Sequence, residues 1–152
     1  WGGGQEADLR AGTLPTPLIV GFAAAVQEAM ADRDERHTRL TGLRDQLWNG
    51  LNDQLPAVER NGAAAPRLAH NLNITLPGMS GSRLHRSLRP RLACSSGSAC
   101  SNGAPSHVLQ ALGRSRADAE ASLRLSLGRG TTPAEIEQAI ATIVEAVAAQ
   151  QS

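Results

Sequence analysis

The chain has no lysine, and all fifteen of its basic residues are arginine. Arginine stays protonated and is not a comparable amine nucleophile, so this chain has no side chain that can form the usual lysine Schiff base with a carbonyl compound. Aromatic residues make up only 2% of the sequence. A core must therefore come from leucine, isoleucine, valine and alanine, and a hydrophobic content of 41% in 152 residues is enough for one domain.

The sequence also lacks membrane-spanning segments, a large net charge and a zinc-binding pattern. No apolar run is long enough to span a bilayer and no signal-peptide pattern stands at the start, so we expect no membrane association. The net charge of +1 predicts neither a nucleic-acid nor a polyanion partner. Two cysteines without a wider framework suit a reducing compartment, and we expect the cytoplasm. The cysteines and the four histidines match no zinc spacing, so no metal site is expected.

Residues 95–100 read Ser-Ser-Gly-Ser-Ala-Cys, five small residues followed by a thiol. Small side chains pack little and leave the backbone free to move. The turn residues that follow, with Pro105, predict the start of a helix, and the partial positive charge there favours a thiolate. The pattern fits a nucleophilic Cys100 on a mobile loop, and it fits an incidental loop cysteine equally well.

Periodicity and capping residues predict two helices followed by strands that alternate with helices. This order indicates an open α/β sandwich, a small sheet packed with helices. The helices are expected at residues 16–30, between Asp32 and Pro56, between Ser80 and Pro90, at 105–112, from 115 and from 132; the strands are expected at 57–60, 68–76, 91–94 and 122–127.

Two residues within the predicted strands invite a closer interpretation. Cys94, in the strand at 91–94, is interpreted as a small buried core residue. Arg124 lies between leucines in the strand at 122–127. Its guanidinium either belongs to a solvated face or makes two parallel hydrogen bonds to a carboxylate, and local sequence leaves both open.

In combination, the motifs resemble the C-terminal part of the cysteine desulfurases, which are pyridoxal-phosphate enzymes of the class-V aminotransferase family. The resemblance covers essentially the whole chain. Its motifs lie at residues 2–6, 10–13, 95–100, 105–109, 111–113 and 123–129, with Thr131 and Thr132 after the last.

This resemblance implies the small C-terminal domain of a fold-type-I pyridoxal-phosphate enzyme. Residues 1–15 would be a loop at the end of the large cofactor domain, and residues 16–152 the small α/β domain with the catalytic cysteine loop. By resemblance, Cys100 is the catalytic nucleophile and Arg124 binds the substrate carboxylate. Thr13 is implied to contact the cofactor phosphate of the neighbouring subunit in a homodimer.

The implied reaction removes sulfur from L-cysteine to give L-alanine and a persulfide on Cys100. A sulfur-acceptor or iron–sulfur scaffold protein would then take the sulfur, for cluster assembly or thiolation. Pyridoxal 5'-phosphate needs a lysine anchor that this chain lacks, so we expect a C-terminal fragment or one piece of a split enzyme. The alternative is a non-catalytic fragment or subunit, which carries a persulfide or binds a partner.

Overall fold

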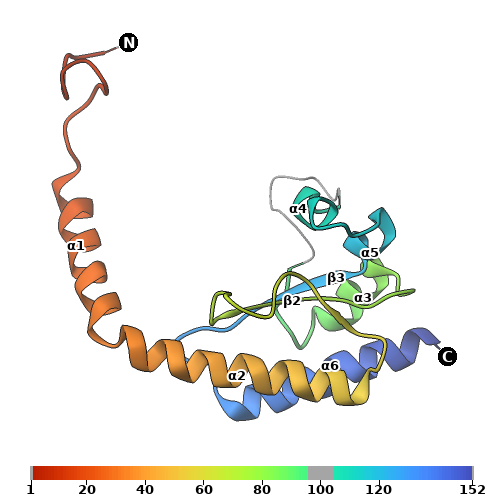
Figure 1. Cartoon of the computed structure of the whole chain (residues 1–152). Coiled ribbons are helices and arrows are strands. Elements are labelled where there is room, and N and C mark those ends of the chain that lie inside the picture. The colour runs from red at the N-terminus through yellow and green to blue at the C-terminus, as the bar shows by residue number, and fades with distance from the viewer. Residues whose placement is uncertain (1, 96–104, 152) are drawn as a thin grey trace. The chain divides into compact units, whose positions relative to one another are not determined.

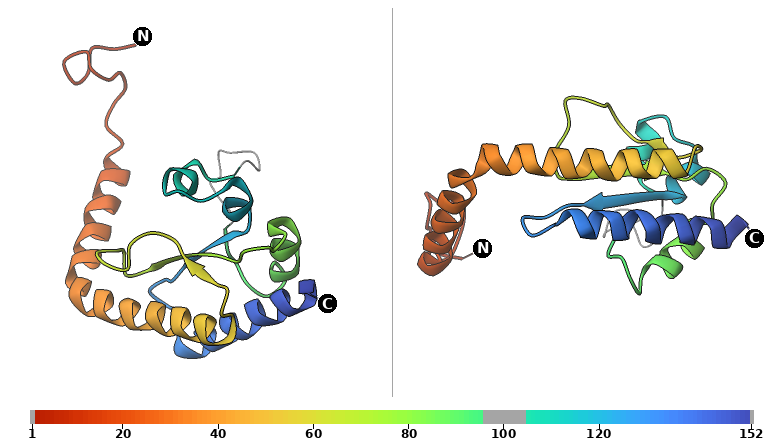
Figure 2. Two further views of the ribbon diagram at one scale, coloured as in Figure 1. Left: turned by 45° about the vertical axis from the view of Figure 1, so that its right-hand side comes forward. Right: turned by 90° about the horizontal axis from the view of Figure 1, so that it is seen from below.

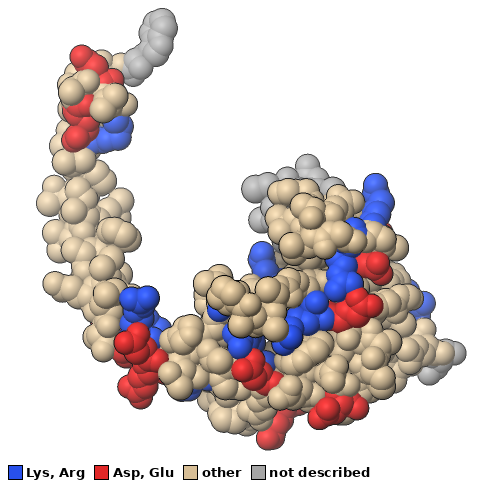
Figure 3. Space-filling model, viewed as in Figure 1, with Lys and Arg blue, Asp and Glu red and all other residues tan. Residues whose placement is uncertain are grey.

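The computed structural model describes residues 2–95 and 105–151 (Figure 1). Contacts divide the chain into two units, Trp1–Glu35 and Arg36–Ser152. The first unit contains a turn-rich segment and the helix α1, Thr16–Ala31, which forms where the sequence predicts it. No residue of α1 is buried, and Figure 3 shows this helix as a nearly uncharged surface. The predicted domain boundary after residue 15 stays a prediction.

The remaining elements confirm the predicted α/β class, with a small sheet packed with helices. In chain order they are α2 (Arg33–Gln54), β1 (Glu59–Arg60), β2 (Asn71–Thr75), α3 (Gly81–Leu88), α4 (His107–Ala111), α5 (Arg116–Glu120), β3 (Ser122–Ser126) and α6 (Pro133–Gln151).

The three strands form one antiparallel sheet in the order β1-β2-β3. In the pairing of β2 with β3, Leu72 lies opposite Leu125. Ile74 lies opposite Leu123, so all four apolar side chains share one face. Polar residues pair on the other face: Asn71 with Ser126, Asn73 with Arg124, and Thr75 with Ser122. The sheet thus has an apolar face for the core and a polar face.

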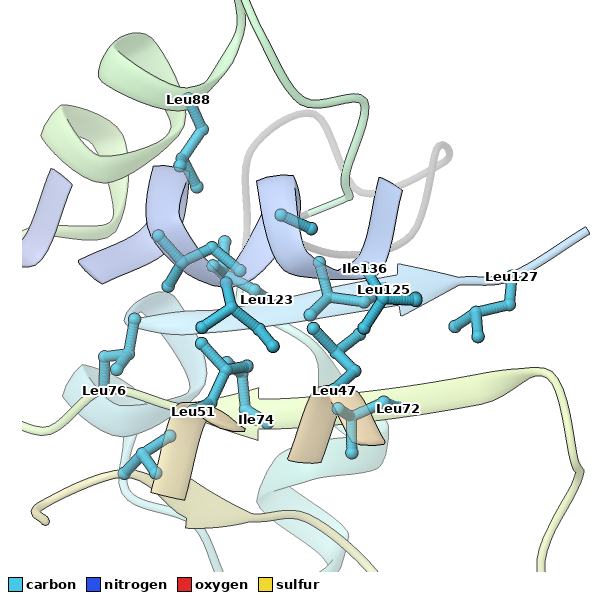
Figure 4. Packing of buried hydrophobic residues seen from close by; sticks show 14 of the residues in the cluster. Leu47, Leu51, Leu72, Ile74, Leu76, Leu88, Leu123, Leu125, Leu127 and Ile136 are labelled. Carbon is cyan, nitrogen blue, oxygen red and sulfur yellow. The ribbon is translucent and has the colours of Figure 1, made fainter. Parts of the chain in front are cut away.

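The helices α2 and α6 cover the apolar face of the sheet, on the side away from α4 and α5 (Figures 1 and 2). Figure 4 shows Leu47 and Leu51 of α2 among the apolar side chains of the strands, which are Leu72, Ile74, Leu123 and Leu125. These two side chains and Ile143 of α6 are at most 2% exposed. Burial of each such side chain stabilises the fold by about 1.5–3 kcal/mol, so the aromatic-poor sequence still builds a core.

Side-chain caps start the later helices where the sequence places them. The hydroxyl of Ser115 accepts a hydrogen bond from the Asp118 amide at 3.1 Å, at the start of α5. At the start of α6, the Thr132 amide donates to the Glu135 carboxylate at 2.8 Å, and the Glu135 amide donates back to the Thr132 hydroxyl. This reciprocal arrangement is the predicted capping box.

The prediction of a strand at residues 91–94 is wrong. The amides of Arg91 and Leu92 both donate to the Leu88 carbonyl at 2.9 Å, so the chain is still turning away from α3 there. These amides are therefore not available for a sheet ladder. Only Ser95, one residue later, pairs with a strand.

Gly81 allows α3 to start directly against the backbone of α5. A Cβ atom at this position would overlap the carbonyl oxygen of Glu120, which the backbone cannot move away cheaply. We expect Gly81→Ala to lower the free energy of unfolding by about 1–3 kcal/mol. The matched control is Gly42→Ala in α2, where a Cβ meets nothing within 4 Å. It should raise stability by about 0.5–1 kcal/mol. Denaturant unfolding measures both, and equal effects of the two variants would contradict the close approach.

Candidate functional site

Arg124 lies on the polar face of the sheet, beside the start of the small-residue run. Its amide donates to the Ser95 carbonyl at 2.7 Å, and the Ser95 amide donates back at 3.1 Å. On the other edge, β3 pairs Arg124 with Asn73 of β2. The structure therefore brings together two sequence motifs that lie far apart in the chain. The segment that contains Cys100 begins directly beside Arg124.

The side chain of Arg124 is exposed, whereas Leu123 and Leu125 on either side of it are buried. Within the described residues, its guanidinium makes no hydrogen bond or ion pair. A guanidinium presents donors in a planar fork that matches a carboxylate. Arg124 is thus available to bind a carboxylate ligand above the polar face.

The structure says less about the other two predicted site residues, Cys100 and Thr13. Cys100 falls within residues 96–104, outside the described residues. Thr13 is exposed in the first unit. Its hydroxyl suits a phosphate ligand, and its contact with the cofactor stays a prediction. Because the sequence has no lysine, this chain lacks the covalent anchor for pyridoxal phosphate.

A hydrogen-bonded cluster fixes the segment that follows residues 96–104. Arg114, between α4 and α5, donates from Nε to the Asn61 side-chain oxygen at 2.5 Å and forms an ion pair with Glu59. Asn61 is 5% exposed, and its amide nitrogen donates to Thr75 at 2.9 Å. Thr75 in turn contacts Ser122 at 2.8 Å. Arg114 therefore fastens the α4–α5 segment to the polar face of the sheet.

Sequence reasoning missed this cluster. The dipeptide Asn61-Gly62 predicts a turn, and Gly62 does adopt a positive φ of 78°. A turn is a sufficient reason for an asparagine at position 61. The local sequence therefore does not indicate that the side-chain amide of Asn61 is buried and hydrogen-bonded. Only the folded sheet brings Asn61 to Thr75 and Ser122.

Cys94 lies at the edge of the core, half-buried rather than fully buried as predicted. Its Sγ atom is 3.8 Å from Nδ1 of His85 on α3. Burial raises the pKa of the Cys94 thiol and lowers the pKa of the His85 imidazole. Both groups therefore favour their neutral forms at neutral pH.

Two further findings concern residues 2–95 and 105–151. No helix there is long and apolar enough to cross a bilayer. No three histidine, cysteine, aspartate or glutamate side chains gather there in a way that could bind a metal ion.

Comparisons with known proteins match almost the whole chain. The model of the family described as aminotransferase class-V matches residues 3–139. Proteins described as cysteine desulfurase IscS, from Shewanella piezotolerans and Tolumonas auensis, are each 44% identical over 148 residues. These residues are 96% of this chain and 36% of either relative, so the chain spans just over a third of their length.

Solved structures resemble the chain in the same way. A NifS-like protein from Rickettsia africae matches with a TM-score of 0.82 and 27% identity, over 97% of this chain and 39% of that one. DndA from Streptomyces lividans matches with a TM-score of 0.64 and 31% identity, over 83% of this chain and 35% of that one.

The two thiols should differ in reactivity. Because burial raises the pKa of Cys94, less of it is thiolate at neutral pH than for an exposed cysteine. We expect iodoacetamide to label Cys94 more slowly than Cys100, and the rate at Cys94 to keep rising at higher pH. Peptide mass spectrometry between about pH 6 and about pH 10 measures both rates. Faster labelling of Cys94 at neutral pH would reverse the assignment, and the Cys94→Val variant identifies the signal of Cys100.

Proposed function

Because this chain belongs to the class-V aminotransferase family, we propose that it is the part of a cysteine desulfurase that contains the sulfur-accepting thiol. The whole protein then converts L-cysteine to L-alanine and leaves the sulfur as a persulfide on Cys100. Identity of 44% over 148 residues supports this reading over a non-catalytic carrier or binding module.

The pairing of Ser95 with Arg124 is the observation that supports the proposal most directly. In L-cysteine only two carbon atoms separate the carboxylate carbon from the sulfur. A residue that binds the carboxylate therefore places the sulfur a few ångströms away. The acceptor thiol must come from a neighbouring segment, and the segment with Cys100 starts beside Arg124.

Three residues of this chain, Arg124, Cys100 and Thr13, have distinct roles in the proposed reaction. Arg124 binds and orients the substrate carboxylate through two parallel hydrogen bonds. The Cys100 thiolate attacks the substrate sulfur, an S–S bond forms, and the C–S bond breaks with its electron pair left on carbon, which takes up a proton. Pyridoxal phosphate supplies the electron-withdrawing ring that makes this bond labile. Thr13 contributes a hydroxyl to the cofactor phosphate.

Other features of the whole protein follow from the family resemblance and stay predictions. They are a homodimer, a cytoplasmic location, and transfer of the sulfur to an acceptor or iron–sulfur scaffold protein.

Replacing Cys100 tests the nucleophile. We expect Cys100→Ser in the whole protein to abolish persulfide formation and alanine release, since a hydroxyl cannot accept sulfane sulfur. Cys94→Val is the matched control and should leave turnover nearly unchanged, because it exchanges one small apolar side chain for another. Alanine and sulfide are measured with L-cysteine as substrate. Full activity of Cys100→Ser would show that another group accepts the sulfur.

Replacing Arg124 tests the carboxylate site separately. In Arg124→Lys, a point charge replaces the planar fork, which should cost about 1–3 kcal/mol of substrate binding. The KM for L-cysteine should then rise about 5- to 150-fold. Arg116→Lys on α5 is the control, because its side chain is 75% exposed and pairs with Glu120 on the same helix. An unchanged KM and kcat in Arg124→Lys would assign Arg124 to a solvated surface.

A further inference from the structure

The middle of the chain has a strongly one-sided charge. Residues 60–117 contain eight arginines and no aspartate or glutamate. The net charge of +1 hides this imbalance, because all fourteen acidic residues lie before or after the segment. An anionic ligand would therefore be attracted to this part of the protein, wherever its arginines are not already paired.

Most of these arginines have a partner. Five of them contact a carboxylate, a backbone carbonyl or an aromatic ring: Arg60, Arg67, Arg91, Arg114 and Arg116. The other three, Arg83, Arg86 and Arg89, belong to α3 and its C-cap. In the part of the chain that the structure describes, their guanidinium groups make no hydrogen bond or ion pair. The unpaired positive charge is thus concentrated on one helix.

One face of α3 lines a cavity of about 590 Å³. Positions 82, 85, 86 and 89 follow the i, i+3, i+4, i+7 spacing that places side chains along one side of a helix. They bring Ser82, His85, Arg86 and Arg89 to the cavity, while Leu84 and Leu88 point into the core. Leu92 and Cys94, in the segment that follows α3, complete the lining. The volume lies within the range of small-molecule sites.

The cavity combines two kinds of chemistry. Arg86 and Arg89 supply exposed positive charge that matches carboxylates. Cys94 supplies a free thiol whose sulfur is 3.8 Å from Nδ1 of His85. The Nε2 atom of His85 is buried and has no hydrogen-bond partner among the described residues, so Nδ1, which faces the thiol, is the ring nitrogen with a hydrogen-bonding neighbour there. A ligand that fits this lining must offer both negative charge and a thiol-reactive group.

We propose that the α3 cavity binds an anionic, low-molecular-weight disulfide, whose carboxylates pair with Arg86 and Arg89, and that Cys94 forms a mixed disulfide with it. The proposal concerns a thiol that the desulfurase reaction does not use. It is therefore independent of the proposed function and can be tested separately from it.

The exchange balances without a further oxidant. In the tautomer that leaves Nδ1 without a hydrogen, His85 accepts the Sγ proton of Cys94. The thiolate attacks one sulfur of the ligand, an S–S bond forms to Cys94, and the S–S bond of the ligand breaks. The departing thiolate takes the proton. Cys94 is oxidised, and one half of the ligand leaves as the reduced thiol.

The test compares two disulfides that differ in charge. The protein with Cys100→Ser, so that Cys94 is the reacting thiol, is incubated with oxidised glutathione, which has carboxylates, or with the uncharged 2-hydroxyethyl disulfide. Mass spectrometry of the peptide that contains Cys94 gives the rate of each. Arg86→Gln and Arg89→Gln remove charge from the cavity, and Arg83→Gln removes the same charge from α3 outside the cavity lining.

We expect oxidised glutathione to modify Cys94 faster than the neutral disulfide does. Arg86→Gln and Arg89→Gln together should lower the glutathione rate about tenfold or more and leave the neutral rate unchanged. Arg83→Gln should change neither rate. The neutral disulfide reports accessibility, so a folding defect would alter both rates. Absence of a mixed disulfide at Cys94, or an equal effect of the charge variants on both disulfides, would overturn the proposal.

Discussion

The antiparallel pairing of β2 with β3 is the interaction on which the rest of the second unit depends. Its register places Leu72 opposite Leu125 on the face that α2 and α6 cover. The same register places Asn73 opposite Arg124 on the other face. Hydrophobic burial of the first face thus determines, through the alternation of a strand, which polar groups stand on the second.

The polar face is organised by hydrogen bonds instead of apolar contact. At one end, Asn61 joins the sheet to Arg114 and so fixes α4 and α5. At the other, the backbone of Arg124 bonds to Ser95 and leaves its guanidinium unpaired within the described residues. A buried amide with several partners contributes about 0.5–1.5 kcal/mol per bond, and loss of one partner costs more because the others stay desolvated. The same face therefore contains both the structural bonds and a guanidinium that is unpaired among the described residues and can bind a ligand.

Local sequence predicted those parts of the fold that local forces determine. The capping box of Thr132 and Glu135 and the alternation around Arg124 each depend on residues a few positions apart. The wrong prediction of a strand at 91–94 shows the limit, because these four residues do not reveal that the amides of Arg91 and Leu92 bond back to Leu88. The pairing of Ser95 with Arg124 joins distant segments, so no local pattern announces it. The importance of Arg124 came from the family resemblance, and its place beside the thiol segment came from the structure.

The alternation in β3 also limits how this part of the protein can change in length. Deletion or insertion of one residue between Ser122 and Ser126 would exchange the two faces for every position beyond it. Arg124 would then point toward the leucines of α2, and Leu123 or Leu125 would take its place above the polar face. A change of two residues would keep the alternation. Gain and loss of single residues should therefore be confined to the connecting turns of this domain, whatever substitutions its strands accept.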